Sequence, residues 1–436
     1  MSESTRLSYT QVEVTEGLEG PAVKRAFVSL SDFEVQSRLR ASSRPESTVF
    51  DPAWGRKADS ATFQPCEHYH SQDRYVVRQL DVYGEKWTFT GVFDGHLGDA
   101  TVEHTAYHLP IIVTQFLQTA LADSSTSVPG PNDIREILSR AITSFDDAIA
   151  GDVLELFPGG IASLRHRSDE EIRRVINDYY ESGENYKKAK LCMYGTTALV
   201  ALVDPDYRNL WVANLGDCEA VLVSPNPNAR FKCEILTNIH NGDNQLEVER
   251  VRREHPGEPE CVLNGRVLGA IAPFRYIGDA PFKQPAEFTR RILYNLYPGI
   301  PDSSPWDDFL SRNRTPPYIS SQPEVLHRQL TGPSSHAQLR TIPSFLILAT
   351  DGLTELYDGW DRDEMAEDWA RCIGSAHYPQ TKASGPTTSA PGSDNLALHL
   401  LRHALGGEDV VQVSQMLTLD MTTPWMDDTT IVVQAL

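Results

Sequence analysis

The sequence lacks long apolar segments and paired cysteines, and it has too few basic residues to balance its acidic ones. No stretch approaches the roughly 20 apolar residues that cross a bilayer as a helix. The six cysteines show no CxxC spacing, which excludes a dense disulfide scaffold and a zinc ribbon. Walker-type, GxGxxG and GxSxG motifs are also absent, so nothing supports nucleotide binding or serine-hydrolase chemistry.

The charge balance excludes two kinds of partner. The 436 residues include 60 Asp and Glu against 39 Lys and Arg, a formal net charge of −21. Nucleic acids and anionic membranes repel such a chain at long range, so we expect neither as its main partner. Hydrophobic residues make up 40% of the chain, which is enough for a packed core and argues against global disorder. The acidic balance suits a protein that binds cations.

The polar and apolar residues are distributed unevenly along the chain. Residues 1–60 are polar and weakly patterned, and predict an N-terminal arm before a single domain over 61–436. Stretches near 123–131, 276–317 and 374–394 are typical of loop insertions in that domain. The N-terminal residues include several glutamates and no apolar run, unlike a secretory signal or a basic transit peptide. We therefore expect an intracellular protein and favour the cytoplasm; no pattern predicts an oligomeric state.

Periodicity predicts a mixture of helices and strands. Apolar residues recur at helical spacing over 134–145, with Asp133 and Glu136 as the expected capping box. Two β-like runs, 196–203 and 209–214, are expected to pair across a short turn. Strands and helices do not alternate strictly, which favours an α+β layered fold.

Four aspartates stand at the ends of strand-like runs. Asp94, Asp217 and Asp351 each end an apolar run, and Asp427 opens the last one. Carboxylates that converge at rigid strand ends repel one another unless protons or cations neutralise them. Hard divalent cations take oxygen ligands, and a pair of them activates a water and clamps a phosphoryl group. A single Asp-Gly pair after a strand is ordinary turn chemistry, but four such sites favour a two-metal hydrolase.

The residues around these aspartates resemble the signature blocks of one family. The blocks FDGHGG, GTTA, VANxGDSR, LATDGLW and DDxTVIVV are matched in order by residues 92–98, 194–198, 212–217, 348–353 and 427–433. Over about residues 70–436, the chain therefore resembles the metal-dependent protein serine/threonine phosphatases of type 2C. The resemblance implies a four-layer α/β/β/α sandwich of two antiparallel sheets flanked by helices. It also implies a phosphoprotein substrate, hydrolysed at phosphoserine or phosphothreonine by a metal-activated water.

Further residues resemble the pyruvate dehydrogenase phosphatase branch of this family. The similar stretches are 247–256, 266–279 and 315–325. Because the members that define this branch are mitochondrial, a mitochondrial location is the alternative to the cytoplasm. The insertions at 276–317 and 374–394 are then candidates for docking protein substrates, since loops carry specificity on such scaffolds.

The resemblance also implies a set of metal ligands for Mg²⁺ or Mn²⁺. In the family, two ions share one aspartate, which matches Asp94, and the carbonyl matching Gly95 binds the second ion. Asp351 and Asp427 match the ligands of the first ion. Asp217, together with Asp351, would supply a third and weaker site.

Other matched positions depart from the family or carry a different role. His96 matches the proposed general acid, which protonates the leaving serine or threonine oxygen. Gln72-Asp73 stands where the family usually has Glu-Asp, so Asp73 is a candidate metal ligand while a neutral amide replaces its neighbour. Leu97 replaces a glycine beside the histidine. Asp279 lies in a Gly-Asp turn that resembles one in the family, with a purely structural turn cap as the alternative.

Two alternatives to a phosphatase remain open at this point. The residues Gln72 and Leu97 favour a catalytically weak or inactive pseudophosphatase that acts as a binding protein. A zinc enzyme is the other hypothesis, because His104 and His108 are spaced i, i+4 on an expected helix. That pair lacks the intervening Glu of HExxH, and helical histidines are more often simply exposed or packed.

Overall fold

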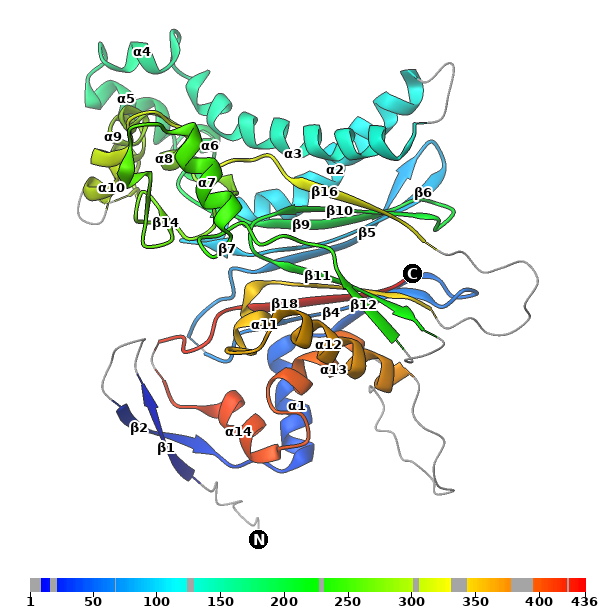
Figure 1. The fold of residues 1–436 in the computed structure, drawn as a ribbon. Helices are drawn as coiled ribbons and strands as arrows, with labels where there is room; N and C mark the ends of the chain where they lie inside the picture. The colour runs from blue at the N-terminus through cyan, green and yellow to red at the C-terminus, as the bar shows by residue number, and fades with distance from the viewer. Residues whose placement is uncertain are drawn as a thin grey trace, which may run out of the picture. The chain divides into compact units, whose positions relative to one another are not determined.

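The computed structural model describes residues 9–15, 22–66, 68–123, 129–226, 231–300, 306–330, 343–377, 395–421 and 423–436. The chain forms two compact units (Figure 1). Unit 1 consists of Met1–Tyr75, Glu219–Leu236 and Pro333–Leu436, and unit 2 consists of Val76–Cys218 and Thr237–Gly332. Among the described residues, no helix is long and apolar enough to cross a membrane.

Unit 1 is built on a six-stranded antiparallel sheet in the order β12-β11-β17-β18-β4-β3. Its strands are β3 (Glu46–Asp51), β4 (Arg56–Phe63), β11 (Glu219–Pro225), β12 (Phe231–Ile235), β17 (Phe345–Ala349) and β18 (Thr429–Ala435). Its helices are α1 (Asp32–Ser43), α11 (Asp351–Glu355), α12 (Arg362–His377), α13 (Leu396–Ala404) and α14 (Val410–Thr418). The helices α1, α12 and α13 pack on one face of this sheet (Figure 1), and α14 packs on α1. A separate hairpin joins β1 (Tyr9–Thr15) and β2 (Ala22–Val28).

The boundary expected at residue 60 does not coincide with the edge of a structural element. It falls inside β4, which pairs with β18 in the register Ala61↔Ile431 and with β3 on its other side, so residues 46–60 include two strands of the sheet and do not form an arm. The sequence of β4 does not alternate apolar and polar residues, because the strand buries polar side chains. Asp59 is fully buried, and its carboxylate accepts hydrogen bonds from the Ser47 hydroxyl (2.6 Å) and the Leu396 amide (2.9 Å). The assignment of 61–436 to one domain stays a prediction.

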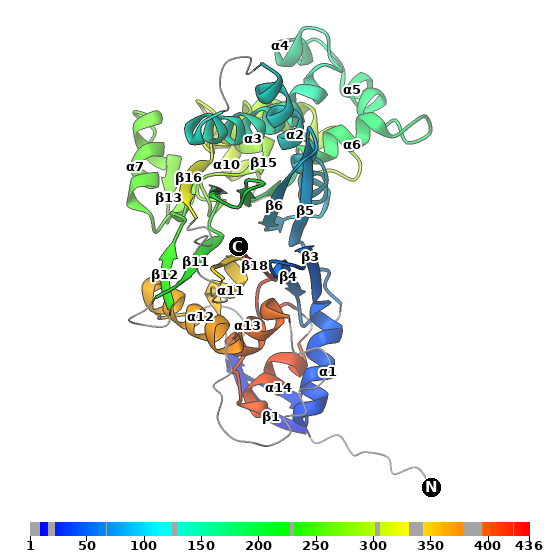
Figure 2. The ribbon, with the colours of Figure 1, turned by 90° about the vertical axis from the view of Figure 1, so that its right-hand side faces the viewer.

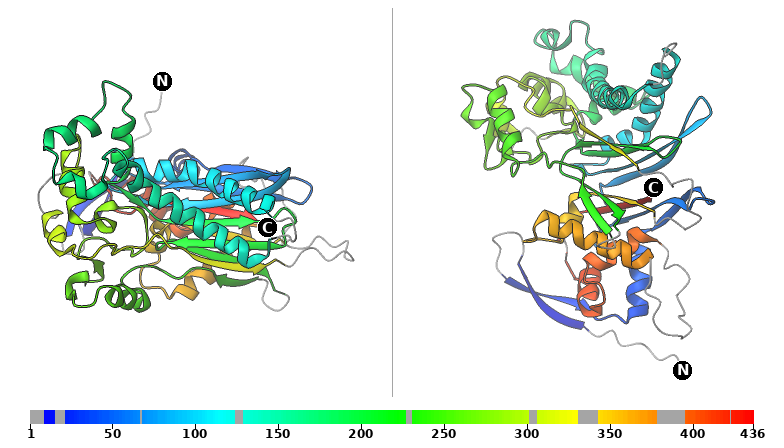
Figure 3. Two further views of the ribbon diagram at one scale, coloured as in Figure 1. Left: turned by 90° about the horizontal axis from the view of Figure 1, so that it is seen from above. Right: turned by 45° about the vertical axis from the view of Figure 1, so that its right-hand side comes forward.

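Unit 2 contains a five-stranded antiparallel sheet in the order β16-β10-β9-β6-β5. Its strands are β5 (Arg74–Val82), β6 (Glu85–Phe93), β9 (Ala198–Val203), β10 (Asn209–Leu215) and β16 (Glu324–Gln329). Two long helices, α2 (Ala100–Asp123) and α3 (Pro131–Leu154), lie side by side along this sheet (Figure 3, left). A small three-stranded sheet joins β7 (Gly95–His96), β8 (Gly195–Thr196) and β15 (Ile277–Gly278) in the order β15-β8-β7.

The remaining elements of unit 2 are short. They are α4 (Gly160–Leu164), α5 (Asp169–Ile176), α6 (Glu184–Leu191), α7 (Gln245–Glu254), β13 (Val262–Leu263), β14 (Arg266–Val267), α8 (Ala280–Lys283), α9 (Ala286–Arg291) and α10 (Trp306–Arg312), with 3-10 turns at Pro259–Cys261 and Leu293–Asn295. Helices α4, α5 and α6 lie together (Figure 2). The expected insertion at 276–317 therefore contains one strand and three helices, apart from 301–305, which lie outside the described residues.

Several expectations from the sequence are confirmed. The α+β class, with antiparallel sheets flanked by helices, is observed in both units. The helix expected over 134–145 lies within α3, and β9 pairs with β10. The capping box expected between Asp133 and Glu136 is wrong, because the helix begins earlier, at Pro131. Asp133 is instead the third helical residue, and its Oδ2 accepts a hydrogen bond from the amide of Gly130, the N-cap (2.7 Å). Residues 124–128 and 378–394, which cover most of the other two insertions, lie outside the described residues.

The burial of β4 leads to a stability prediction. Phe63 is completely buried in the core of unit 1, so Phe63→Ala should lower the free energy of unfolding by about 3–5 kcal/mol, measured by urea denaturation. Phe33→Ala is the matched control, because Phe33 is 82% exposed and its loss should change stability by less than about 0.5 kcal/mol. If both variants lowered the free energy of unfolding by the same small amount, the packing of Phe63 in the core of unit 1 would be contradicted.

Candidate functional site

Asp94 directly follows β6, and two threonines hold its backbone. The Asp94 amide donates to Thr197 Oγ1 (2.9 Å), while its carbonyl accepts from the Thr197 amide (2.9 Å) and the Thr196 hydroxyl (3.0 Å). Three hydrogen bonds thus hold the backbone of one residue on both sides, which leaves little freedom in where its carboxylate can lie. This contact explains why the Gly-Thr-Thr block accompanies the Asp-Gly-His block in the sequence.

Asp217 follows β10 through a turn that needs glycine. Gly216 has φ +123°, and a Cβ there would lie 2.5 Å from Thr197 Cγ2, so a larger residue would be strained and would collide. The buried His240 holds the turn, because its Nδ1 accepts from the Gly216 amide (3.2 Å) and its own amide donates to the Gly216 carbonyl (3.1 Å). Asn241 Nδ2 donates to Asp217 Oδ2 (3.3 Å). Backbone and side-chain contacts together therefore fix the position of Asp217.

These two turns bring a pair of carboxylates together within unit 2. Asp94 and Asp217 offer carboxylate oxygens within 4.8 Å of each other. Two negative charges at this separation repel unless a proton or a cation neutralises one of them. The pair is therefore suited to a cation with oxygen ligands.

The three-stranded sheet of β7, β8 and β15 places His96 against Asp279. Strand β8 lies between the other two, with Gly195 opposite both His96 and Gly278. His96 Nε2 lies 3.1 Å from Asp279 Oδ1 and 2.9 Å from Oδ2. A Cβ at Gly195 would overlap the Asp279 carboxylate and lie 2.8 Å from His96 Cε1. Glycine at this position is thus what allows the histidine and the aspartate to meet.

The environment of His96 favours its protonated form. Burial by itself lowers the pKa of His96, but the charge and hydrogen bond of Asp279, together with the charge of Asp217, outweigh burial and raise the pKa above its usual value. The edge of the imidazole also packs against the Tyr276 ring, with 4.8 Å between the ring centroids. A protonated, oriented imidazole can donate a proton, and Asp279 contacts it directly rather than serving only as a turn cap.

In unit 1, paired strand ends position Asp351. The Thr350 amide donates to the Thr430 carbonyl (3.0 Å), and the Thr430 amide donates to Thr350 Oγ1 (2.8 Å), which joins the ends of β17 and β18. A Cβ at Gly352 would overlap the Asp428 carbonyl, so only glycine permits this approach. Asp351 is thereby held beside the acidic start of β18.

A cluster of three carboxylates results. Asp351, Glu355 and Asp427 each offer one oxygen, and these oxygens all lie within 4.8 Å of one another. An all-oxygen donor set of acidic residues is the set that Mg²⁺ and Mn²⁺ prefer, so the residues present fit a hard divalent cation. The sequence did not predict Glu355 as a ligand. Its i, i+4 spacing from Asp351 on α11, which puts both on one helix face, was the available signal.

Asp73 contacts the residue that precedes Asp351 in the chain. Its Oδ2 accepts a hydrogen bond from the Thr350 hydroxyl (2.7 Å), and the residue belongs to no cluster of three potential ligands in the described part of the chain. Burial raises its pKa well above the usual range, the Thr350 hydrogen bond opposes this, and the charges of Asp428 and Asp427 add to the rise. Asp73 thus contacts the residue immediately before Asp351.

The neighbouring Gln72 contributes its backbone. Its amide donates to Asp428 Oδ2 (2.6 Å), while its side-chain nitrogen lies 3.3 Å from the Tyr69 hydroxyl. Asp428 Oδ1 accepts from Gln64 Nε2 (2.8 Å). The amide that replaces a family carboxylate is therefore directed toward a tyrosine.

The histidine pair on α2 gains no support as a zinc site. The rings of His104 and His108 lie 4.3 Å apart between centroids, and His104 stacks on Phe145. Burial and the charge of His108 lower the pKa of His104 to about 4. Among the described residues, neither histidine belongs to a cluster of three potential metal ligands.

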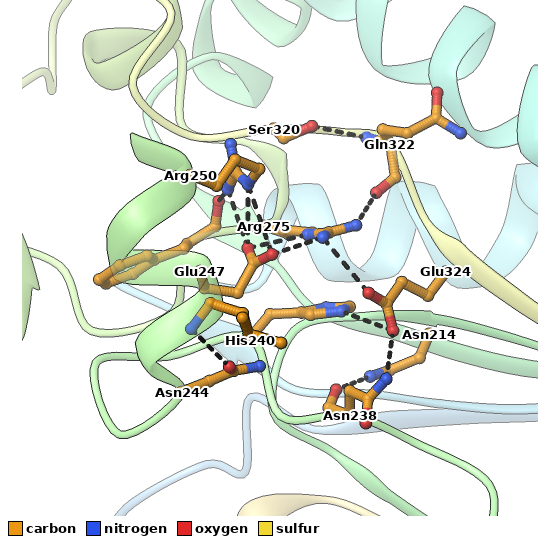
Figure 4. Close-up of polar contacts among 12 residues, drawn as sticks. Asn214, Asn238, His240, Asn244, Glu247, Arg250, Arg275, Ser320, Gln322 and Glu324 are labelled. Carbon is orange, nitrogen blue, oxygen red and sulfur yellow. Dashed lines mark hydrogen bonds and ion pairs between the residues drawn. The ribbon is translucent and has the colours of Figure 1, made fainter. Parts of the chain in front are cut away.

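A network of charged side chains supports the histidine that holds the Gly216 turn (Figure 4). His240 Nε2 lies 3.5 Å from Glu324 Oε2, and Glu324 Oε1 lies 3.5 Å from Arg275 Nη2. Arg275 donates to both carboxylate oxygens of Glu247, at 2.9 and 2.5 Å, and Arg250 donates to the same carboxylate. Burial raises the pKa of Glu247, but the hydrogen bonds and charges of the two arginines outweigh it and lower the pKa to about 2.

The fold and these clusters define an α+β protein with acidic strand ends suited to hard cations, the class of metal-dependent hydrolases. The family model for protein phosphatase 2C matches residues 79–371. A protein phosphatase 2C homolog of Schizosaccharomyces pombe is 27% identical over 386 residues, which cover 86% of this chain and 78% of the relative. The chain belongs to the protein phosphatase 2C family, which makes it a metal-dependent phosphoprotein phosphatase by class.

Two further comparisons add detail. The mitochondrial pyruvate dehydrogenase (acetyl-transferring) phosphatase 1 of Rattus norvegicus is 31% identical over 394 residues, which cover 79% of this chain and 71% of the relative. A serine-threonine phosphatase 2C structure from Toxoplasma gondii aligns over 90% of this chain and 98% of that one, with 17% identity and a TM-score of 0.47.

The buried network predicts a pH-dependent loss of stability. Glu247→Gln leaves buried arginine charge uncompensated and should cost about 3 kcal/mol of unfolding free energy near pH 7. A carboxylate with a lowered pKa stabilises the fold fully above its ordinary value, and this stabilisation is lost as pH falls from 4.5 toward about 2. Urea denaturation should therefore show a constant difference between the two proteins from about pH 6 to 8 that narrows below about pH 4.5.

The control for this variant is Glu249→Gln, an exposed position on the same helix, which should change stability by less than about 0.5 kcal/mol. A Glu247→Gln deficit that stays constant down to about pH 3.5 would contradict the charge-network explanation.

Proposed function

We propose that the chain hydrolyses phosphoserine and phosphothreonine in proteins with Mg²⁺ or Mn²⁺ held by its strand-end aspartates. The observation that carries this is the all-oxygen cluster of Asp351, Glu355 and Asp427 in a member of the family. Divalent cations in such a site lower the pKa of water and neutralise phosphoryl charge. Asp351 and Asp427 would hold one ion, and Asp94 and the Gly95 carbonyl would hold another.

Other residues complete the proposed roles. Asp217 contributes to a third and weaker site. Asp73 acts through the Thr350 hydroxyl, which it fixes beside Asp351. His96 donates the proton that the leaving serine or threonine oxygen needs, and Asp279 keeps that imidazole oriented and protonated.

The relatives supply the first substrate to test. The rat relative is named a mitochondrial pyruvate dehydrogenase phosphatase, and its alignment with this chain covers most of both sequences. We therefore propose phosphorylated pyruvate dehydrogenase as the first protein substrate and the mitochondrion as the compartment to test against the cytoplasm.

Phosphate release from a phosphothreonine peptide, with Mn²⁺, Mg²⁺ or EDTA, tests the activity. We expect release with a metal and none with EDTA. Asp351→Asn should lower the rate by more than the roughly 10–100-fold that substitutions around metal ligands cost, because it removes a ligand charge from the cluster. Asp358→Asn, an exposed aspartate shortly after α11, is the control and should keep full activity.

A folded protein that releases no phosphate with either metal would contradict the proposal and favour the binding-protein alternative. One observation supports that alternative: Leu97 has φ +63° where the family has glycine, and a leucine in this backbone region is strained. Leu97→Gly and Gln72→Glu would then be the variants to test for recovered turnover.

The role of His96 is tested by the choice of leaving group. Asp279→Asn should lower kcat for a phosphothreonine peptide by about 10²-fold or more, since an alkoxide needs a proton as it leaves. The same variant should barely change turnover of p-nitrophenyl phosphate, whose phenolate leaves without a proton. Equal losses on both substrates would show that Asp279 supports the fold or the metals and not the proton transfer.

A further inference from the structure

A buried ion pair joins α3 to α8 in unit 2. Asp146 on α3 and Lys283, the last residue of α8, have side chains that are 5% and 11% exposed, and Lys283 Nζ lies 2.6 Å from Asp146 Oδ1. Both charges lose their hydration on burial, and apolar side chains in the place of such a pair often cost no stability. Stability alone is therefore a weak explanation for the pair, and its other contacts indicate its role.

The other hydrogen bonds of this pair hold the backbone just before Asp279. Asp146 Oδ1 also accepts from the Gly278 amide (2.7 Å), and Lys283 Nζ also donates to the Tyr276 carbonyl (2.7 Å). Hydrogen bonds to charged groups are stronger than those between neutral ones. The pair thus fixes one backbone group immediately before Asp279 and another three residues before it.

The two ends of the segment 276–279, which contains β15, both contact the imidazole of His96. The Tyr276 ring packs against the imidazole edge, with 4.8 Å between the centroids, and Asp279 Oδ2 lies 2.9 Å from His96 Nε2. Lys283 holds the backbone of the first contact residue, and Asp146 holds the residue before the second. The ion pair therefore acts on the histidine through this segment.

The backbone at Asp279 is strained and needs support. Asp279 has φ +50°, which is unfavourable for a residue with a Cβ, and it directly follows Gly278 at φ +84°. Such a conformation persists only where the surrounding contacts determine it. The Asp279 amide donates to the Tyr194 carbonyl (2.9 Å), and the Gly278 amide donates to Asp146. Asp146 thus supplies one of the contacts that keep the strained turn in place.

We propose that Asp146 and Lys283 are positioning residues for the proton transfer by His96. They hold the segment 276–279 so that its two ends keep the imidazole aligned with the leaving oxygen. The proposal deepens the proposed phosphatase function and rests on it for the proton transfer, but the positioning itself does not require turnover.

NMR spectroscopy tests the positioning in the absence of turnover. The signal is the Cε1–H resonance of His96 in protein with isotope-labelled histidine, recorded without metal at a fixed pH and assigned by its loss in His96→Asn. Asp279→Asn gives the change that loss of the direct contact causes. Asp146→Leu and Lys283→Met, which remove the acceptor and the donor of the backbone bonds, should move the resonance in the same direction. An unchanged resonance in both folded variants would overturn the proposal.

Two further variants of α3 are the matched controls. Asp147→Asn removes the charge of the next residue, which is exposed, and Leu138→Ala opens a cavity at a fully buried position of the same helix. Neither should move the His96 resonance, although Leu138→Ala should lower stability. If Leu138→Ala moved it as far as the test variants do, the effect would be general loosening and the proposal would be overturned. If Asp146→Leu does not fold, Lys283→Met decides the question.

Kinetics test the consequence for catalysis. Asp146→Leu and Lys283→Met should each lower kcat for a phosphothreonine peptide at least about 10-fold, because a displaced proton donor is poorly aligned with the leaving oxygen. Turnover of p-nitrophenyl phosphate, whose phenolate leaves without a proton, should barely change. Equal losses on both substrates, or no loss on either, would overturn the proposal.

These measurements separate the proposal from the proposed function. If the wild type turns over neither substrate, the phosphatase function fails, while the His96 resonance still decides the positioning. If the wild type turns over both substrates and the two test variants retain its kcat for the phosphothreonine peptide, the positioning role fails alone.

Discussion

The mutual repulsion of three carboxylates in unit 1 limits how the residues around them can be arranged. Asp351, Glu355 and Asp427 bring three oxygens within 4.8 Å of one another, which is unfavourable without a proton or a cation between them. Much of the nearby backbone serves to maintain that approach. Thr350 joins the two strand ends, and Gly352 lets the chains come closer than any residue with a Cβ would allow. The fold thus maintains an arrangement whose oxygen ligands suit a hard cation.

In unit 2, small residues likewise position charged side chains close to one another. Thr197 binds the backbone of Asp94 on one side and packs against Gly216 on the other, so one small residue positions two acidic turns. Gly195 does the same for His96 and Asp279. The glycines and threonines of the sequence blocks are therefore the close neighbours of the acidic and basic groups, and their small size is what permits those groups to meet.

The sequence predicted those features that have a local pattern. Apolar periodicity located α3, and the aspartates at strand ends were visible because each follows or opens an apolar run. Strand β4 was missed because it buries Asp59 through hydrogen bonds and not through apolar alternation. The contact of His96 with Asp279 joins residues 183 positions apart, so no local pattern could reveal it. Chemistry that depends on long-range pairing becomes visible only in the folded chain.

Calorimetric titration of Mn²⁺ into metal-free protein measures, independently of any turnover, whether the acidic side chains bind cations. We predict saturable binding of at least two ions, with affinity lowered at least about 10-fold by Asp427→Asn, because the substitution removes a ligand charge. A folded wild-type protein that binds no Mn²⁺, or an Asp427→Asn variant that binds it unchanged, would contradict the assignment of these carboxylates as a metal site.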